Sequence, residues 1–235
     1  MSLPDVVSRE QWLAARKDLL VREKELTRAR DRLSADRRRL PMVEIEDYVL
    51  TGPDGDARLL DLFEGRRQLI VGHFMFDPSW DEGCPSCSAG ADEVARGLLE
   101  HLHVRETTLA YVSRAPIEKI GAYKARKGWT FPWYSSFDSD FNVDFGVTLD
   151  PGIERRTYNF APVDAALAGE MPGTSVFLRE GDRVFHTYSS YARGAEWTGG
   201  SYAYLDLTAL GRQEAWEEPR DRTVHLRGAN PDFAS

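Results

Sequence analysis

Hydrophobic residues in the first forty positions recur at a spacing typical of one face of a helix. Ser8 and Gln11 have the spacing of a capping box, and Pro41 cannot continue a helix. The pattern therefore predicts one long helix over residues 8–36. Its narrow apolar stripe packs either on the chain's own domain or on a second copy in a homodimer. The stripe repeats every seven residues and consists of Trp12, Leu19, Leu26 and Leu33.

Beyond residue 40 the apolar positions form short runs of strand length. QLIVGHFMF at 68–76 and TTLAYVS at 107–113 are nearly uninterrupted, as in strands that are covered on both faces. Turn-forming residues at 52–55 and 180–182 indicate two hairpins. The remaining predicted elements are a hairpin of 44–50 and 57–62, helices over 85–102 and 116–126, a strand over 131–136, a hairpin of 175–179 and 183–188, a strand over 203–207 and a helix over 208–216.

Strands that alternate with helices favour an α/β fold with at least one parallel strand pair, and the late hairpin makes the sheet mixed. We expect three parts: an N-terminal helical extension over 1–40, the α/β domain over 41–217, and a polar C-terminal tail over 218–235.

Composition narrows the function. The 235-residue chain has a formal net charge of −8, which argues against a nucleic-acid binder and a binder of anionic membranes. The sequence has no apolar run long enough to span a bilayer, and the N-terminus lacks the pattern of a secretory signal. Only two cysteines are present, too few for a disulfide scaffold, so we expect a reducing, cytoplasmic compartment.

Both cysteines lie in one motif, GHFMFDPSWDEGCPSCSAG at residues 72–90. Cys84 is predicted to begin the helix that follows a buried strand, where free backbone N–H groups and the helix dipole favour a thiolate. Cys87 lies one turn further on the same face, and Pro85 suits the first helical position. Cys84 can therefore attack a disulfide, and Cys87 can resolve the mixed disulfide that results.

Other uses of the two cysteines stay open. A zinc site needs four ligands, and the sequence offers no second cysteine pair, although His73, His101 and His103 are candidates. The alternative function is a non-catalytic binding module in which Cys84 and Cys87 are structural or bind a metal.

Several motifs carry a family resemblance. LIVGHFMF followed by CPSC resembles the strand and active-site turn of the thioredoxin-like superfamily. More closely, the chain resembles an uncharacterised, mostly bacterial thioredoxin-like family known as a domain of unknown function. The matching blocks are GRRQLIVGHFMF, GCPSCS, VSRAP, GWTFPWYSS, FNVDFGV, HTYSSYARG and LDLTALGRQE. The resemblance implies a thioredoxin-like mixed sheet flanked by helices, with the long helix and a β-hairpin as N-terminal extensions. It lends no established reaction.

The segment from residue 110 to 147 is also similar in layout to peroxiredoxins. That pattern, however, places a proline seven residues and a threonine three residues before the reactive cysteine. Here Asp77 and Asp81 occupy those positions, and Pro78 is one residue away. A peroxiredoxin-type thiol peroxidase is therefore the less favoured function.

The thioredoxin resemblance implies further site residues. His73 falls where thioredoxins carry a buried carboxylate, which implies a proton relay for Cys87; the alternative is a buried neutral histidine. Gly173, preceded by Pro172, falls where thioredoxins carry a cis-proline, which implies that Gly173 and Thr174 bind the substrate backbone. Proline first in the intervening Pro85-Ser86 pair resembles the more oxidising members.

Two residues near the motif add to the candidate site. Trp80 lies in the loop before Cys84 and is a candidate wall of a substrate groove. Arg114, at the end of a predicted strand, is either a holder of an anion or thiolate or a solvated side chain. We expect a thiol–disulfide oxidoreductase whose partners are protein or small-molecule thiols and disulfides. We expect no metal, because a second cysteine pair is missing, and no bound cofactor, because no Gly-rich dinucleotide fingerprint is present.

Overall fold

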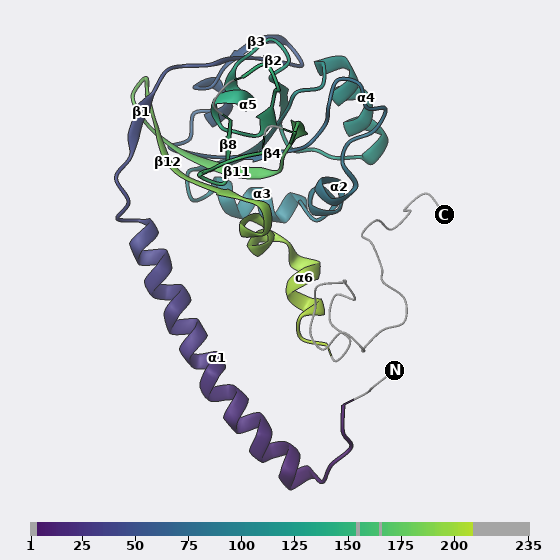
Figure 1. Cartoon of the computed structure of the whole chain (residues 1–235). Coiled ribbons are helices and arrows are strands. Elements are labelled where there is room, and N and C mark those ends of the chain that lie inside the picture. The colour runs from purple at the N-terminus through teal and green to yellow at the C-terminus, as the bar shows by residue number, and fades with distance from the viewer. Residues whose placement is uncertain (1–3, 154–155, 165, 209–235) are drawn as a thin grey trace. The chain divides into compact units, whose positions relative to one another are not determined.

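A computed structural model describes residues 4–153, 156–164 and 166–208 (Figure 1). These residues divide into two units, one with residues 4–41 and 204–208 and the other with residues 42–203, and each is described by itself. The predicted polar tail over 218–235 lies outside the described residues, as does the predicted helix over 208–216 except for its first residue.

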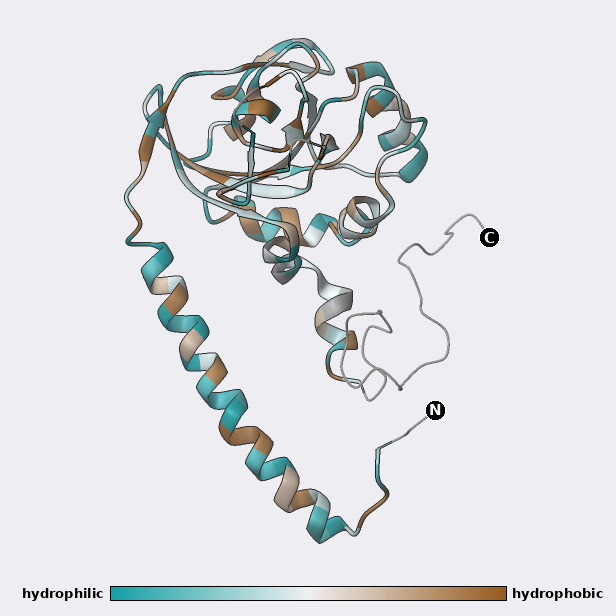
Figure 2. Ribbon diagram, in the orientation of Figure 1, coloured by the Kyte–Doolittle hydropathy of each residue, from teal (hydrophilic) through white to brown (hydrophobic). Residues whose placement is uncertain are grey.

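The first unit consists mainly of α1 (Arg9–Arg37). Ser8 caps it as predicted: Ser8 Oγ accepts from the Gln11 N–H at 3.2 Å, and Gln11 Oε1 accepts from the Ser8 N–H at 3.0 Å. Figure 2 shows hydrophobic residues along α1 separated by hydrophilic ones. The long N-terminal helix is confirmed, and its role in a homodimer stays a prediction.

The second unit contains the main sheet, whose strand order is β1-β12-β11-β4-β5-β6-β2-β3. Its strands are β1 (Val43–Ile45), β2 (Val49–Gly52), β3 (Gly55–Arg58), β4 (Gln68–His73), β5 (Thr107–Ser113), β6 (Trp133–Ser135), β11 (Gly173–Glu180) and β12 (Arg183–Tyr191). Short two-stranded pairs join β7 (Thr148–Leu149) to β10 (Gly169–Glu170), and β8 (Thr157–Tyr158) to β9 (Ala161–Pro162). The helices are α2 (Pro85–Asp92), α3 (Arg96–His103), α4 (Ile117–Lys127), α5 (Phe141–Asp144) and α6 (Gly200–Leu205), with 3₁₀ turns η1 (Asp61–Phe63) and η2 (Ala192–Thr198).

The centre of the sheet follows the predicted pattern. The two nearly continuous apolar runs form β4 and β5, which pair in parallel, and β6 extends the parallel arrangement. The β11–β12 hairpin turns at Gly181 with φ +62°, and β11 pairs antiparallel with β4. A parallel core with an antiparallel hairpin beside the motif strand confirms the thioredoxin-like mixed sheet flanked by helices.

Each face of the sheet buries its own hydrophobic cluster. Leu69 and Val71 of β4 pack with Phe141 of α5 on one face. Phe74, just beyond β4, packs on the other face with Ala91 of α2 and other aromatic residues. Figure 1 shows α2 and α3 on one side of the β4–β11 pair and α5 on the other.

The predicted helix over 85–102 is broken into α2 and α3. Ala91 of α2 and Leu99 of α3 both enter the Phe74 cluster. The chain leaves the helical path at residues 93–95, so α2 ends at Asp92 and α3 begins at Arg96.

Two other predictions are wrong. Residues 203–207 do not form a strand, because Ala203 lies within α6; an alternation over five residues is too short to separate a strand from a single helical turn. The early hairpin is also shifted. It consists of β2 and β3, whereas β1 pairs with β12, some 140 residues later in the chain.

Candidate active site

Cys84 lies where the loop after β4 meets the N-terminus of α2. It occupies the N-cap position with φ −51° and ψ 130°, and Pro85 follows as the first helical residue. The Cys84 N–H donates to the Met75 carbonyl at 2.9 Å, and the Cys84 carbonyl accepts from the Ser88 N–H at 2.9 Å. Both backbone bonds fix the orientation of the cysteine relative to the helix.

The two sulfur atoms have opposite acidities. Cys84 Sγ lies at the N-terminus of α2, beside the Cys87 thiol and the backbone N–H groups of Cys87 and Ser86. The Cys87 thiol is the largest influence, and together these donors outweigh burial and lower the pKa of Cys84 to about 6. The pKa of Cys87 is raised well above its ordinary value by the bond it donates to Cys84, by burial and by the Cys84 charge. The proton of the pair is therefore held on Cys87.

The motif remains accessible at this end of the sheet. Pro85 and Ser86 are exposed, whereas Cys84 and Cys87 are half-buried and both are free thiols. Cys87 packs against the Phe74 cluster, and the Met75 N–H donates to its sulfur. Cys84 is thus the more open of the two sites of attack.

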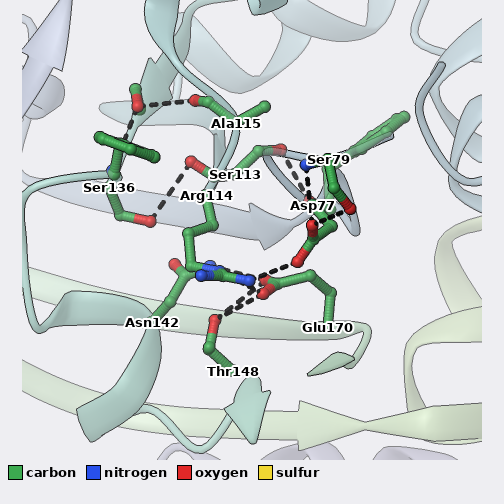
Figure 3. Close-up of polar contacts among 12 residues, drawn as sticks. Asp77, Ser79, Ser113, Arg114, Ala115, Ser136, Asn142, Thr148 and Glu170 are labelled. Atoms are coloured by element: carbon green, nitrogen blue, oxygen red, sulfur yellow. Dashed lines mark hydrogen bonds and ion pairs between the residues drawn. The ribbon is translucent and has the colours of Figure 1, made fainter. Parts of the chain in front are cut away.

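Two basic residues, Arg114 and Lys119, fasten the loop that precedes Cys84. Arg114, just after β5, pairs with Asp77, whose Oδ1 also accepts from the Ser79 N–H at 2.8 Å (Figure 3). Lys119 Nζ donates to the carbonyls of Pro78 and Trp80 at 2.8 and 2.7 Å. Near Cys84, an exposed ion pair joins Arg126 and Glu82. Trp80, in the middle of the loop, is 38% exposed.

Gly173 and Thr174 begin β11 beside the end of β4. Gly173 pairs with His73, and Thr174 pairs with Gly72. Gly173 has no room for a side chain, because an added Cβ would lie 2.8 Å from Cδ1 of Tyr191. The preceding Pro172 carbonyl accepts from the Tyr158 hydroxyl at 2.8 Å. The loop to Cys84 leaves the same end of the sheet, so Gly173, Thr174 and Cys84 all lie at that end.

The structure does not bring His73 to the cysteines. Its Nε2 hydrogen-bonds with Ser175 Oγ at 2.8 Å, and its ring packs on Phe141 and Phe145. That face of the sheet is opposite the cluster in which Cys87 packs. Burial lowers the pKa of His73 to about 3, so the ring is neutral. These contacts fit the alternative of a buried neutral histidine better than a proton relay.

Met75 and Glu170 contribute to the site although neither is predicted from the sequence. Met75 supplies only its backbone, which no residue pattern reveals. Glu170 lies in β10 and binds Arg114, 56 residues away. The sequence marks Arg114 as a candidate for an anion or thiolate, and the structure pairs it with two carboxylates.

In residues 4–153, 156–164 and 166–208, no group of three or more His, Cys, Asp or Glu side chains could hold a metal ion. No helix in the same ranges has the length and apolarity needed to cross a membrane.

Solved structures with a similar chain path include peroxiredoxins. Peroxiredoxin Q from Xanthomonas campestris has 17% identity and a TM-score of 0.46, with 68% of this chain and 90% of that chain covered. Peroxidoxin BcpB from Mycobacterium tuberculosis has 15% identity and a TM-score of 0.45, with 68% and 93% covered. At these values the likeness carries no argument about activity.

The comparison with curated proteins gave no match. A family model described as "bacterial protein of unknown function (DUF899)" matches residues 1–227. The match runs through the long helix, the motif strand and both cysteines, so the chain belongs to the DUF899 family.

Proposed function

We propose that the protein is a thiol–disulfide oxidoreductase in which Cys84 attacks and Cys87 resolves. The observation that carries the proposal is the place of Cys84 at the N-cap of α2, with the free thiol of Cys87 one helical turn further on and a lowered pKa at Cys84. Thiolate, rather than thiol, is the nucleophile in disulfide exchange. A cysteine with a pKa of about 6 carries about ten thiolates for every thiol at pH 7.

The exchange proceeds in two displacements. The Cys84 thiolate attacks one sulfur of a substrate disulfide, a mixed disulfide forms, and the other substrate sulfur leaves as a thiolate that takes a proton from water. Cys87 then loses its proton and attacks Cys84 Sγ. The Cys84–Cys87 disulfide forms, the second substrate sulfur leaves, and two electrons have passed from the protein to the substrate. A partner dithiol restores the pair by the same steps in reverse.

The acidity of Cys87 supports this order. Two of the causes that raise its pKa, the hydrogen bond to Cys84 and the Cys84 charge, disappear when Cys84 becomes part of a neutral mixed disulfide. Its proton is therefore released more easily at the step that needs a second thiolate. The Met75 N–H, which donates to Cys87 sulfur, also favours that thiolate.

The substrate and the surroundings belong to the same proposal. The substrate is a protein or small-molecule disulfide that binds at the end of the sheet where Gly173 and Thr174 lie, near the exposed Pro85-Ser86 pair and Trp80. Electrons arrive through a partner thiol, with no bound cofactor. We place the reaction in the cytoplasm, where reduced thiols are maintained.

Alkylation and trapping test the proposal. The reduced protein is pulsed with iodoacetamide from pH 4.5 to 9, and each cysteine is followed by peptide mass spectrometry. Cys84 should reach half of its maximal rate near pH 6, and Cys87 only at alkaline pH. With oxidised glutathione, Cys87→Ser should accumulate a glutathione adduct at Cys84, and the matched control Cys84→Ser should not.

Two results would contradict an oxidoreductase. One is an ordinary thiol pKa at Cys84. The other is a failure of the Cys87→Ser variant to accumulate an adduct. Either result would favour the alternative, a thioredoxin-like binding module, and zinc bound in stoichiometric amount to the purified protein would identify its cysteines as metal ligands. Rapid consumption of hydrogen peroxide by Cys84, with no disulfide reduction, would instead indicate a thiol peroxidase.

A further inference from the structure

The Arg114 side chain joins two segments that flank the candidate site. Its Nε donates to Glu170 Oε1 at 2.6 Å, and its Nη2 donates to Asp77 Oδ2 (Figure 3). Asp77 lies in the loop between β4 and Cys84, and it is the residue of that loop to which Arg114 binds. Glu170 lies in β10, three residues before Gly173. The same guanidinium therefore holds the cysteine loop and the segment that leads into β11.

Glu170 is a firm anchor for this bridge. Only 1% of its side chain is exposed, so its carboxyl group is costly to bury without partners. Thr148 Oγ1 donates to Oε2 at 2.9 Å, and Asn142 Nδ2 donates to the same oxygen at 3.4 Å. Burial still raises the pKa of Glu170, which indicates that its surroundings do not fully replace water. Arg114 supplies the positive charge that this carboxylate requires.

Asp77 is equally constrained on the loop side. Its Oδ1 accepts from both the N–H and the Oγ of Ser79, at 2.8 and 2.6 Å, and its other oxygen is left for Arg114. Because the side chain is bonded at both oxygens, a shift of the guanidinium moves the backbone at Asp77 as well. The bridge is therefore a rigid connection between two backbone segments.

We propose that Arg114 is a positioning residue for disulfide exchange, and that its bridge between Asp77 and Glu170 sets the spacing between the Cys84 loop and the Gly173–Thr174 segment. This inference rests on the proposed function. Arg114 is not among the groups that lower the pKa of Cys84, so it acts through the backbone and not on the sulfur. Without Arg114, the Asp77 and Glu170 side chains have no common partner, and the two segments lose the bridge that joins them.

The test compares Arg114→Gln with a matched control on the same loop. Arg126→Gln removes the ion pair between Arg126 and Glu82. These two side chains are 56% and 70% exposed, and ion pairs exposed to solvent contribute little to stability. The reaction measured is the reduction of insulin with dithiothreitol as electron donor. Arg114→Gln should raise KM about tenfold, the loss expected for one charged hydrogen bond, and leave kcat within about twofold. Arg126→Gln should change neither constant.

Three further readouts separate positioning from general destabilisation. Arg114→Lys keeps the charge but cannot bridge both carboxylates, so its KM should lie between those of the wild type and Arg114→Gln. The pH midpoint of Cys84 alkylation should be the same in all variants. Amide hydrogen exchange should become faster in residues 74–83 and 168–174 together in Arg114→Gln, and in neither segment in Arg126→Gln.

An unchanged KM, a fall in kcat alone, or a shifted alkylation midpoint would overturn the inference, as would faster exchange in only one segment. If Arg114→Gln does not fold, Glu170→Gln weakens the bridge at nearly constant volume and should raise KM in the same direction. If the wild type does not reduce insulin, that result counts against the proposed function. Hydrogen exchange then decides alone whether Arg114 couples the two segments.

Discussion

Gly83, the residue before Cys84, provides a sharp test of how the motif is held. Gly83 is buried, and a Cβ added there would lie 2.5 Å from Cε1 of Phe74 and 3.1 Å from Cε1 of Tyr123. Both rings belong to the buried aromatic cluster, so neither has free space into which it can move. Gly83→Ala must therefore displace either the rings or the loop that carries Cys84.

The expected cost follows from the packing. Forcing an extra methyl group into a well-packed core typically costs about 1–3 kcal/mol. Gly90 is the matched control, because it lies in α2, is exposed, and has nothing within 4 Å of an added Cβ. Alanine is the better helix former, so Gly90→Ala should stabilise the protein by about 0.5–1 kcal/mol. The same substitution at two positions seven residues apart should thus have opposite signs.

Urea denaturation measures both effects. With a slope of about 2 kcal/mol per molar urea, Gly83→Ala should lower the midpoint by about 1 M, and Gly90→Ala should raise it slightly. In the folded Gly83→Ala protein, a displaced loop should also slow the alkylation of Cys84 at pH 6.5. Equal midpoints for the wild type and Gly83→Ala would refute the reasoning, because they would mean that the space beside Phe74 is not filled.

Two further predictions concern titrating groups. Cys87→Ala should raise the pKa of Cys84 above its value of about 6, because the Cys87 thiol is the largest of the influences that lower it. Rates of reaction with iodoacetamide, measured against pH, give the midpoint of Cys84. An unchanged midpoint would contradict the prediction. His73 has a folded pKa of about 3 against an ordinary 6.5, so the unfolded chain binds the extra proton. Its contribution to stability is complete above pH 6.5 and is lost as pH falls from 6.5 towards 3, by up to about 1.4 kcal/mol per pH unit. Urea midpoints of His73→Gln at pH 7, 5.5 and 4.5 should fall less steeply than those of the wild type, and parallel declines would show that His73 does not titrate as described.

Local signals in the sequence predict the centre of the fold well. The Ser8 capping box and the turn at Gly181 each depend on neighbouring residues, and each is found as expected. The strands β4 and β5 are recognisable because both of their faces are covered, which makes their sequences continuously apolar. Cys84 is placed correctly for the same reason, since a buried strand and a proline define where its helix begins.

Features that depend on distant partners could not be predicted. Val43–Ile45 becomes a strand because β12 offers it an edge, and nothing within the first fifty residues indicates that partner. The break between α2 and α3 separates two short helices that each contribute a side chain, Ala91 or Leu99, to the buried aromatic cluster. Arg114 follows the end of β5, and its partner Glu170 lies in β10, a strand of two residues. A strand that short leaves no periodic pattern in the sequence, and nothing in the sequence indicates that the two residues pair.

His73 falls where thioredoxins carry a buried carboxylate, but its contacts in this chain differ from those that a proton relay for Cys87 requires. A proton relay at His73 would have to reach across the sheet, yet the ring is committed to Ser175 and to two phenylalanines on the other face. The Met75 backbone lies beside both cysteines instead, because its carbonyl accepts from the Cys84 N–H and its N–H favours the Cys87 thiolate. One peptide segment of the loop thus fixes both sulfur positions. It follows that the backbone of the loop after β4, rather than a side chain on the motif strand, lies in contact with both cysteines.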